Sequence, residues 1–285
     1  MSGWNPEVSP LATCVGMIKV EGLEVIYPTG THAIAPTTLL FERGRFTVLL
    51  GASGAGKSTL LRALNGLVKP TAGRVTVEGI GPLTGRGSLR SHRRRTGMIF
   101  QQHQLIGRAT VLGNVLTGRL GYHSGLRTLF PLPAAEKRLA LDSIERVGLI
   151  DSALRRVDQL SGGQQQRVGI ARALVQQPTL ILADEPIASL DPATADRVLG
   201  LLHSICKADR ITAIVSLHQL QFARRYADRI VGVARGAVVF DGAPSGLGPA
   251  ETKLIYGTAQ PVVIDEPDLE LQPHLELQRR TGTYA

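Results

Sequence analysis

The most constraining feature of the 285-residue sequence is a glycine-rich segment that joins an apolar strand to an amphipathic helix. Residues 46–50, FTVLL, predict a buried strand, and residues 57–67 carry leucines at helical spacing. The segment between them fits GxxxxGK[ST], a pattern that predicts a loop whose backbone N–H groups turn inward around a phosphate. Such a match is expected by chance only about 0.01 times in a chain of this length. The predicted loop residues are Gly51, Ala52, Ser53, Gly54, Ala55, Gly56, Lys57, Ser58 and Thr59.

Two adjacent acids at the end of a second apolar strand fit the same chemistry. Residues 180–183, LILA, predict a buried strand, and Asp184 and Glu185 follow it directly. Because Lys57 would reach the β- and γ-phosphates of a nucleotide, we expect Ser58 and Asp184 to hold Mg²⁺ beside them. Glu185 could then polarise the attacking water. Acids after a strand are common in surface turns, so the phosphate loop upstream is what favours a catalytic role.

The segment LSGGQQQR, residues 160–167, predicts a second helix start with open backbone N–H groups. Its serine is a good N-cap, and such a start suits another phosphate contact. Two anion sites in one chain make sense if this one serves the nucleotide of a second subunit. The residues predicted to make this contact are Ser161, Gly162, Gly163 and Gln164.

With LSGGQQQR in place, the sequence resembles the ATP-binding subunits of ABC transporters over about residues 17–257. The resemblance implies ATP and Mg²⁺ as cofactors, with Glu185, His218 and Gln101 as catalytic residues. It also implies Ser58, Gln101 and Asp184 around the metal. The remaining landmarks follow in the family's order: the adenine-stacking Tyr27, the Q-loop Gln101, the D-loop Ser189, Leu190 and Asp191, and the switch His218.

The weaker landmarks each have a plainer interpretation. A single histidine after a strand is more often structural, and Tyr27 alone could equally be a core residue. Gln101 and Gln102 are adjacent, and Phe100 before Gln101 favours the first as the Q-loop residue. Their order and position along the chain favour the functional interpretation of each.

Strands that alternate with helices predict a mainly parallel α/β sheet, and residues 101–177 predict an interposed helical subdomain. The resemblance implies a RecA-like P-loop NTPase core with an antiparallel β subdomain and this inserted helical subdomain. We expect an N-terminal extension at residues 1–16, the ABC ATPase domain at 17–257, and a flexible acidic tail at 258–285.

The positive net charge of the chain is compatible with several kinds of partner. The formal net charge is +9 with a sequence pI of about 10.1, which suits nucleic acid, an anionic membrane face or a phosphate ligand. A dense basic run, residues 86–95, is most simply a solvated helix face or loop.

The cysteines and the apolar segments bear on the compartment. Two cysteines 192 residues apart, Cys14 and Cys206, predict no disulfide framework and favour a reducing compartment. The sequence offers no membrane span and no signal peptide, which predicts a cytoplasmic location.

The resemblance also implies partners and a place in the cell. It implies a homodimer that sandwiches two ATP molecules, two integral-membrane permease subunits and a solute-binding protein, at the cytoplasmic face of the inner membrane. Residues 113–123, GNVLTGRLGYH, together with 216–219, SLHQ, look most like subunits that import phosphonates, and phosphite importers are closely similar.

Two further interpretations remain open. One is an importer of polar amino acids or phosphate. The other is a soluble ABC ATPase that acts on nucleic acid, although such proteins usually carry two ATPase units or a long coiled-coil insertion. An exporter or lipoprotein-release ATPase would differ in its genomic neighbours. Because the sequence shows neither two ATPase units nor a long coiled-coil insertion, we expect no nucleic-acid partner.

Overall fold

The computed structural model describes residues 16–101, 104–123 and 132–257. The predicted tail at 258–285 and all but the last residue of the predicted extension at 1–16 lie outside these ranges. Within them, no helix has the length and apolar character needed to cross a membrane. Cys206 is buried, and burial raises the pKa of its thiol to about 12. The other cysteine, Cys14, lies outside the described residues.

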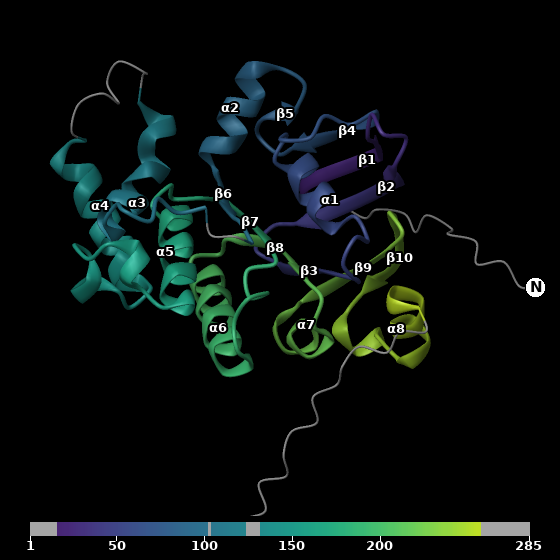
Figure 1. The fold of residues 1–285 in the computed structure, drawn as a ribbon. Coiled ribbons are helices and arrows are strands. Elements are labelled where there is room, and N and C mark those ends of the chain that lie inside the picture. Colours follow the sequence, from purple (N-terminus) through teal and green to yellow (C-terminus); the bar gives the residue numbers. More distant parts are fainter. Residues whose placement is uncertain (1–15, 102–103, 124–131, 258–285) are drawn as a thin grey trace, which may run out of the picture.

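A six-stranded sheet in the order β10-β9-β3-β8-β7-β6 forms the centre of the molecule (Figure 1). Its strands from β9 to β6 run parallel, and β10 pairs antiparallel with β9. This confirms the predicted mainly parallel sheet. The strand bounds are β3 Phe46–Leu50, β6 Thr96–Ile99, β7 Leu180–Asp184, β8 Thr212–Leu217, β9 Arg229–Ala234 and β10 Ala237–Gly242.

Side chains of the central strands alternate between two cores. On β3, Phe46, Val48 and Leu50 belong to one buried cluster, whereas Leu49 belongs to the other. Successive side chains of a strand point to opposite faces, so both faces of this sheet are covered. Helices α5 and α6 share the first core, and α1 shares the second. The bounds of the helices that flank the sheet are α1 Lys57–Leu64, α5 Gly162–Leu174, α6 Pro192–Ala208, α7 Leu220–Tyr226 and α8 Pro249–Tyr256.

A second sheet is antiparallel and has the order β2-β1-β4-β5. Its apolar face packs with α1 in the second core. This confirms the β subdomain that the family resemblance implies. Its strands are β1 Gly16–Ile26, β2 His32–Glu42, β4 Ala72–Val77 and β5 Gly81–Pro82.

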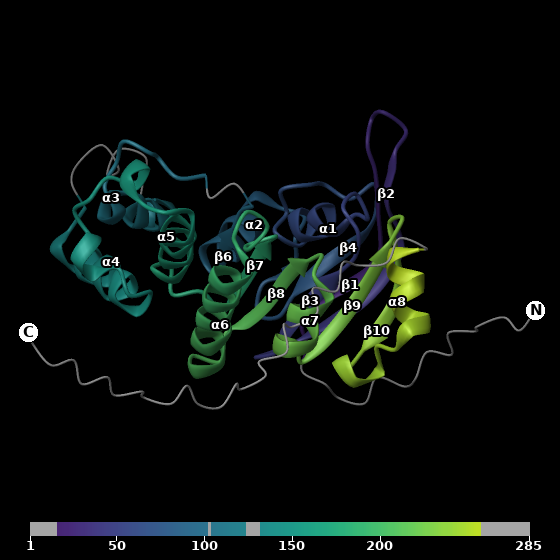
Figure 2. The ribbon, with the colours of Figure 1, turned by 60° about the horizontal axis from the view of Figure 1, so that its bottom comes forward.

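The helical block lies beside the β6 edge of the large sheet and extends away from it (Figure 2). It contains α3 Val111–Leu116, η1 Thr117–Tyr122, α4 Ala134–Arg146, η3 Ile150–Ser152, η4 Val157–Gln159 and the start of α5. The described part of residues 101–177 is therefore mainly helical, as predicted. The short turn η5, Pro244–Gly246, precedes α8 at the other end of the molecule.

The basic run folds as a helix, α2, Arg86–Arg94. Its buried His92 donates from Nε2 to the carbonyl oxygen of Leu64 at 2.9 Å, and this contact holds α2 against the end of α1. Helix α1 ends at Leu64, earlier than the leucine spacing predicts, because Gly66 takes a φ of 63°.

Candidate functional site

The predicted site residues gather where the parallel strands end. The glycine-rich loop follows β3, Gln101 follows β6, the two acids end β7 and begin the next loop, and His218 follows β8. The parallel register places Leu50 beside Leu217, and Asp184 beside Ser216. The carboxyl ends of the strands therefore share one edge of the sheet, the usual position of a ligand site in open α/β sheets.

The glycines of the loop are required by close packing. A Cβ atom on Gly51 would lie 2.3 Å from the carbonyl oxygen of Val233, and one on Gly56 would lie 2.5 Å from that of Ala33. Gly56 also has a φ of 107°, which side-chain-bearing residues rarely adopt. The loop is thus held between β9 and β2 while its last residue turns the chain into α1.

Lys57 lies at the centre of the loop and is almost fully buried. Its Nζ donates to the carbonyl oxygens of Gly51 and Ala52, at 2.8 and 3.0 Å, and lies 3.6 Å from Oε1 of Glu185. Burial lowers the pKa of Lys57, while the negative charges of Glu185 and Asp184 oppose that shift. The ammonium group is therefore placed where a phosphate bound in the loop would be neutralised.

The carboxylate of Asp184 accepts two hydroxyl hydrogen bonds. Ser58 Oγ donates to Asp184 Oδ1 at 2.6 Å, and Ser216 Oγ donates to the same oxygen at 3.0 Å. Ser216 Oγ in turn accepts a hydrogen bond from the backbone N–H of Glu185 at 2.9 Å. One buried serine on β8 therefore positions both acids at the end of β7.

Sequence reasoning did not identify Ser216 as part of this cluster. Its function depends on being opposite Asp184, and that pairing follows from the sheet order β8-β7. The only signal in the sequence is a polar residue inside an otherwise apolar strand, TAIVSL.

Glu185 connects the loop to the start of the helical block. Its side chain lies between Lys57 and Gln101, whose Nε2 donates to Glu185 Oε2 at 3.1 Å. Glu185 has a φ of 44°, a left-handed conformation that is strained for a residue with a side chain. Such strain is held only where the surrounding structure fixes it, and here the Ser216 hydrogen bond does so.

The less specific predictions lie at the margins of this cluster. The hydroxyl of half-buried Tyr27 lies 3.2 Å from Thr59 Oγ1, so the ring stands beside the start of α1. His218 directly follows β8, and its carbonyl oxygen accepts from the Tyr256 hydroxyl at 2.7 Å. Asp191 caps α6 by accepting the N–H of Thr194 at 2.9 Å, as its sequence context predicts.

The LSGGQ segment begins α5 with a capping box. Ser161 Oγ accepts from the N–H of Gln164, and Gln164 Oε1 accepts from the N–H of Ser161, at 3.3 and 2.9 Å. A Cβ atom on Gly163 would lie 2.5 Å from Thr194 Cγ2, so the segment packs closely on the start of α6. Across the described ranges, no hydrogen bond joins this segment to the cluster around Lys57.

A comparison with protein families decides which family this geometry belongs to. Residues 34–188 match the family model described as "ABC transporter". The chain belongs to the ABC transporter family. The match covers the phosphate loop, the LSGGQ segment and the acids that follow β7.

Curated ABC transporter proteins are similar over nearly the whole chain. The phosphite import ATP-binding protein PxtA of Stutzerimonas stutzeri is 61% identical over 267 residues, which cover 92% of this chain and 97% of that protein. The phosphonates import ATP-binding protein PhnC 3 of a Nostoc species is 58% identical, over 88% of this chain and 95% of that protein.

Solved structures support the same fold class for this ABC transporter protein. CbiO1 of Clostridium perfringens, part of the ABC transporter complex cbiONQ, superimposes with a TM-score of 0.71 at 32% identity, over 81% of this chain and 89% of that one. A dimeric post-hydrolysis state of the ATP-binding cassette MJ0796, bound to ADP and phosphate, gives 0.70 at 33% identity, over 80% and 99%. The fold is therefore the α/β ABC ATPase fold with a P-loop core.

Proposed function

We propose that this chain is the ATP-hydrolysing subunit of a bacterial ABC importer and that it powers the uptake of phosphonates or phosphite. The observation that carries the ATPase activity is the convergence of Lys57, Asp184, Glu185 and Gln101 at one edge of the sheet. The substrate class is supported by relatives named for phosphite and phosphonate import, at 61% and 58% identity.

The residues at this edge fit a magnesium nucleotide. Backbone N–H groups of residues 51–56 and the Lys57 ammonium would bind the phosphates. The Ser58 hydroxyl and the Asp184 carboxylate are oxygen ligands of the kind Mg²⁺ prefers, and they lie 2.6 Å apart. Gln101 offers a further amide oxygen. When bound, Mg²⁺ would neutralise part of the phosphate charge.

Within this site, Glu185 is the group placed to orient or deprotonate the attacking water. In the present arrangement its carboxylate contacts Lys57 and Gln101. A phosphate bound in the loop would replace Glu185 as the partner of Lys57, which frees the carboxylate to act on water. We assign His218 to contact with the γ-phosphate and the Tyr27 ring to stacking on adenine.

The LSGGQ segment is assigned to the nucleotide of a second copy of this chain. It has no hydrogen bond to the Lys57 cluster of its own chain in the described residues, and the N–H groups of exposed Ser161 and Gly162 lie at a helix start. In this assembly the loop Ser189–Asp191 lies beside the dimer interface. We further assign two permease subunits and a solute-binding protein as partners, at the cytoplasmic face of the inner membrane.

Removing the Ser216 hydroxyl tests how the two acids are positioned. Ser216→Ala should lower ATP turnover about tenfold, because hydrogen bonds that orient metal-ligating side chains typically contribute 10–100-fold. Steady-state ATPase assays would measure this. Ser204→Ala is the matched control, because Ser204 is exposed on α6 and, among the described residues, its hydroxyl donates only to the carbonyl oxygen of Leu201. Equal turnover in the two variants would contradict the positioning role.

The segment 113–123 would be related to the transported substrate only indirectly, through the shape that it gives the helical block. Its distinctive side chains are engaged inside the chain: buried Asn114 holds both the N–H and the carbonyl of Ile106, and Arg119 pairs with Glu136. They therefore shape the helical block rather than form its outer surface. A surface shaped to fit one class of permease can still record the transported substrate without touching it.

A transport assay tests the substrate class. In vesicles that hold this subunit with its cognate permease and binding protein, methylphosphonate, aminoethylphosphonate or phosphite should stimulate ATP hydrolysis several-fold. The physical reason is that a loaded binding protein favours the closed ATPase dimer. Stimulation by an amino acid, with none by a phosphorus oxyanion, would leave the ATPase assignment intact and refute this substrate class.

A further inference from the structure

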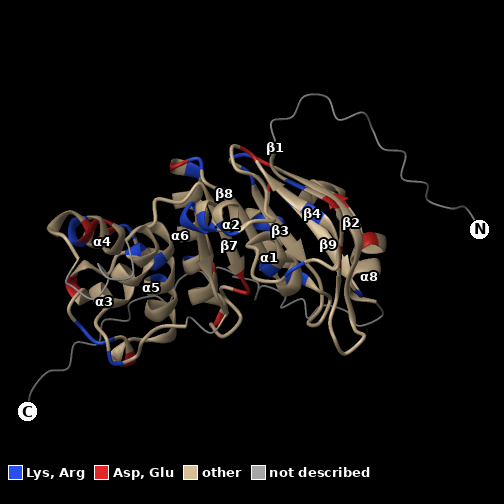
Figure 3. Cartoon of the chain, turned by 90° about the horizontal axis from the view of Figure 1, so that it is seen from above, with Lys and Arg blue, Asp and Glu red and all other residues tan. Residues whose placement is uncertain are grey.

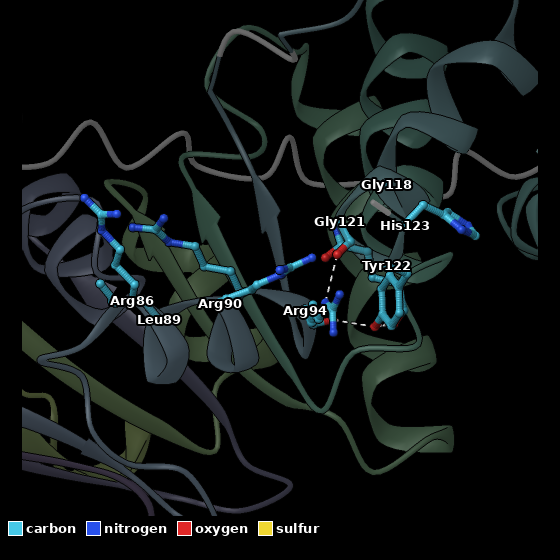
Figure 4. A pocket seen from close by; sticks show the side chains of 10 residues that line it. Arg86, Leu89, Arg90, Arg94, Gly118, Gly121, Tyr122 and His123 are labelled. Carbon is cyan, nitrogen blue, oxygen red and sulfur yellow. Dashed lines mark hydrogen bonds between the residues drawn. The ribbon is translucent and has the colours of Figure 1, made fainter. Parts of the chain in front are cut away.

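Four arginines of α2 point to a second anion site, remote from the phosphate loop. Arg86, Arg90, Arg93 and Arg94 stand at spacings of four, seven and eight residues, so they lie along one side of the helix. Figure 3 shows α2 as a concentration of basic residues. All four line a hollow of about 470 Å³ between α2 and η1 (Figure 4).

The charge of this hollow is not compensated by acids. Among the described residues, no Asp or Glu lines it, and none lines the adjoining hollow of about 370 Å³, which shares Arg90, Arg94 and Tyr122 with it. None of the four guanidinium groups forms an ion pair with a carboxylate of the described residues. Like charges at this spacing on a helix repel one another, so the cluster is destabilising by itself. A bound anion would relieve that repulsion.

Two of the arginines are held in place by the surrounding backbone. Arg93 donates to the carbonyl oxygens of Asn65 and Gly66, at 3.2 and 2.6 Å. Arg94 Nε donates to the carbonyl oxygen of Gly121 at 2.8 Å, and its guanidinium lies 5.6 Å from the centre of the Tyr122 ring. By contrast Arg86 and Arg90 are exposed and make no ion pair with a described residue. The hollow therefore combines guanidinium donors that are already held in position with two that can still reorient toward a ligand.

The opposite wall is equally well defined. The Tyr122 hydroxyl lies 2.5 and 2.8 Å from the carbonyl oxygens of Arg94 and Gln176, between which its single proton is shared, and this fixes η1 against α2 and the end of α5. A Cβ atom on Gly118 would lie 2.4 Å from the carbonyl oxygen of Arg172, so η1 packs closely on α5. At Gly121 a Cβ atom would meet no atom of the described residues within 4 Å, so there the wall is open as far as these residues show.

We propose that this hollow binds a doubly charged phosphorus oxyanion, the phosphate or phosphonate group of a small molecule or of a lipid headgroup. Guanidinium groups offer paired N–H donors that match the oxygens of phosphate. Arg86 and Arg90 are free to close on the anion while Arg94 is held in place. The hollow also leaves room for a substituent on the phosphorus. Binding here does not depend on the proposed transport role.

The position of the hollow gives such a ligand a mechanical effect. One wall, α2, is anchored to α1 of the nucleotide-binding core through His92 and Arg93. The other wall, η1, belongs to the helical block. A ligand that bridges them would restrain the helical block relative to the core, and that block carries the LSGGQ segment.

The test uses the full chain saturated with ADP and Mg²⁺, so that the phosphate loop is filled. Calorimetric titration with inorganic phosphate and with methylphosphonate should show binding that Arg86→Gln/Arg90→Gln weakens about tenfold or more, since charge-assisted hydrogen bonds are lost. The matched control is Lys137→Gln/Arg138→Gln, which removes two exposed charges from α4, outside both hollows. Loss in the first variant alone supports a small-molecule ligand.

A second arm addresses the lipid source. Binding is measured to phosphatidylcholine vesicles that contain phosphatidic acid, and to vesicles of equal charge that contain phosphatidylserine. A selective defect of Arg86→Gln/Arg90→Gln on phosphatidic acid, without binding of the free ions, supports a headgroup ligand. Equal behaviour of the two double variants with every probe, or no binding of any probe, overturns the proposal.

Discussion

Replacing Glu185 with glutamine is expected to lower the kcat of ATP hydrolysis by about 10²–10⁴-fold, the usual contribution of a general base. ATP affinity should change little, because glutamine keeps the size of the side chain and leaves the loop around Lys57 intact. The amide can still accept from Gln101 through its oxygen, but it cannot take a proton from water. Single-turnover hydrolysis and equilibrium nucleotide binding, measured on the same preparation, separate the two effects.

The contrasting variant is Lys57→Ala. Lys57 is the buried cation of the phosphate loop, so its removal should weaken ATP binding itself, about tenfold or more, through loss of a charge-assisted contact. The variant also removes the Lys57 contact of the Glu185 carboxylate and leaves its hydrogen bond from Gln101 in place, which a structure of the free variant would show. Steady-state turnover at the normal rate in Glu185→Gln, within the assembled transporter, would remove Glu185 from the catalytic role.

The architecture was largely predictable because the chain carries strong local signals. The strand FTVLL, Phe46–Leu50, and the cap at Asp191 followed by Pro192 lie where the sequence places them. Both depend on neighbours along the chain. The cluster at the sheet edge was predictable for a related reason, since residues that directly follow parallel strands must meet at one edge.

What the sequence could not supply was contact between elements that are distant along the chain. Ser216 became a site residue only through pairing with Asp184. The arginines of α2 were interpretable as a solvated face until η1 was placed across from them. No strand is predicted from the sequence at β2, His32–Glu42, which is placed by its antiparallel pairing with β1. Pairing order and helix docking depend on the whole fold, so local patterns leave them open.

The second large effect is expected on dimer formation, because we propose that the LSGGQ segment of each chain contacts the nucleotide of the other. In the Glu185→Gln background, ATP and Mg²⁺ should convert the chain to a dimer, and the further change Ser161→Arg should abolish that dimer. Ser161 is exposed at the start of α5, where the proposed partner's phosphates would approach. A long side chain there occupies the space of the γ-phosphate and its contacts. Sedimentation velocity with and without nucleotide measures the outcome.

Two controls separate this effect from a loss of folding. Ser161 also caps α5, and losing an N-cap costs about 1 kcal/mol, which a modest fall in thermal stability of the monomer would reveal. Ser204→Arg adds the same side chain at an exposed position on α6 and should dimerise normally. A dimer that persists in Ser161→Arg, with ATP affinity unchanged, would show that each chain completes its nucleotide site alone.

Complementation gives a sharper test. Mixing Ser161→Arg with Lys57→Ala, both with Glu185 intact, creates mixed dimers in which one site has an intact loop and an intact LSGGQ segment. Both substitutions then fall on the other site of the mixed dimer. We therefore expect the mixture to hydrolyse ATP faster than the sum of the two variants measured separately.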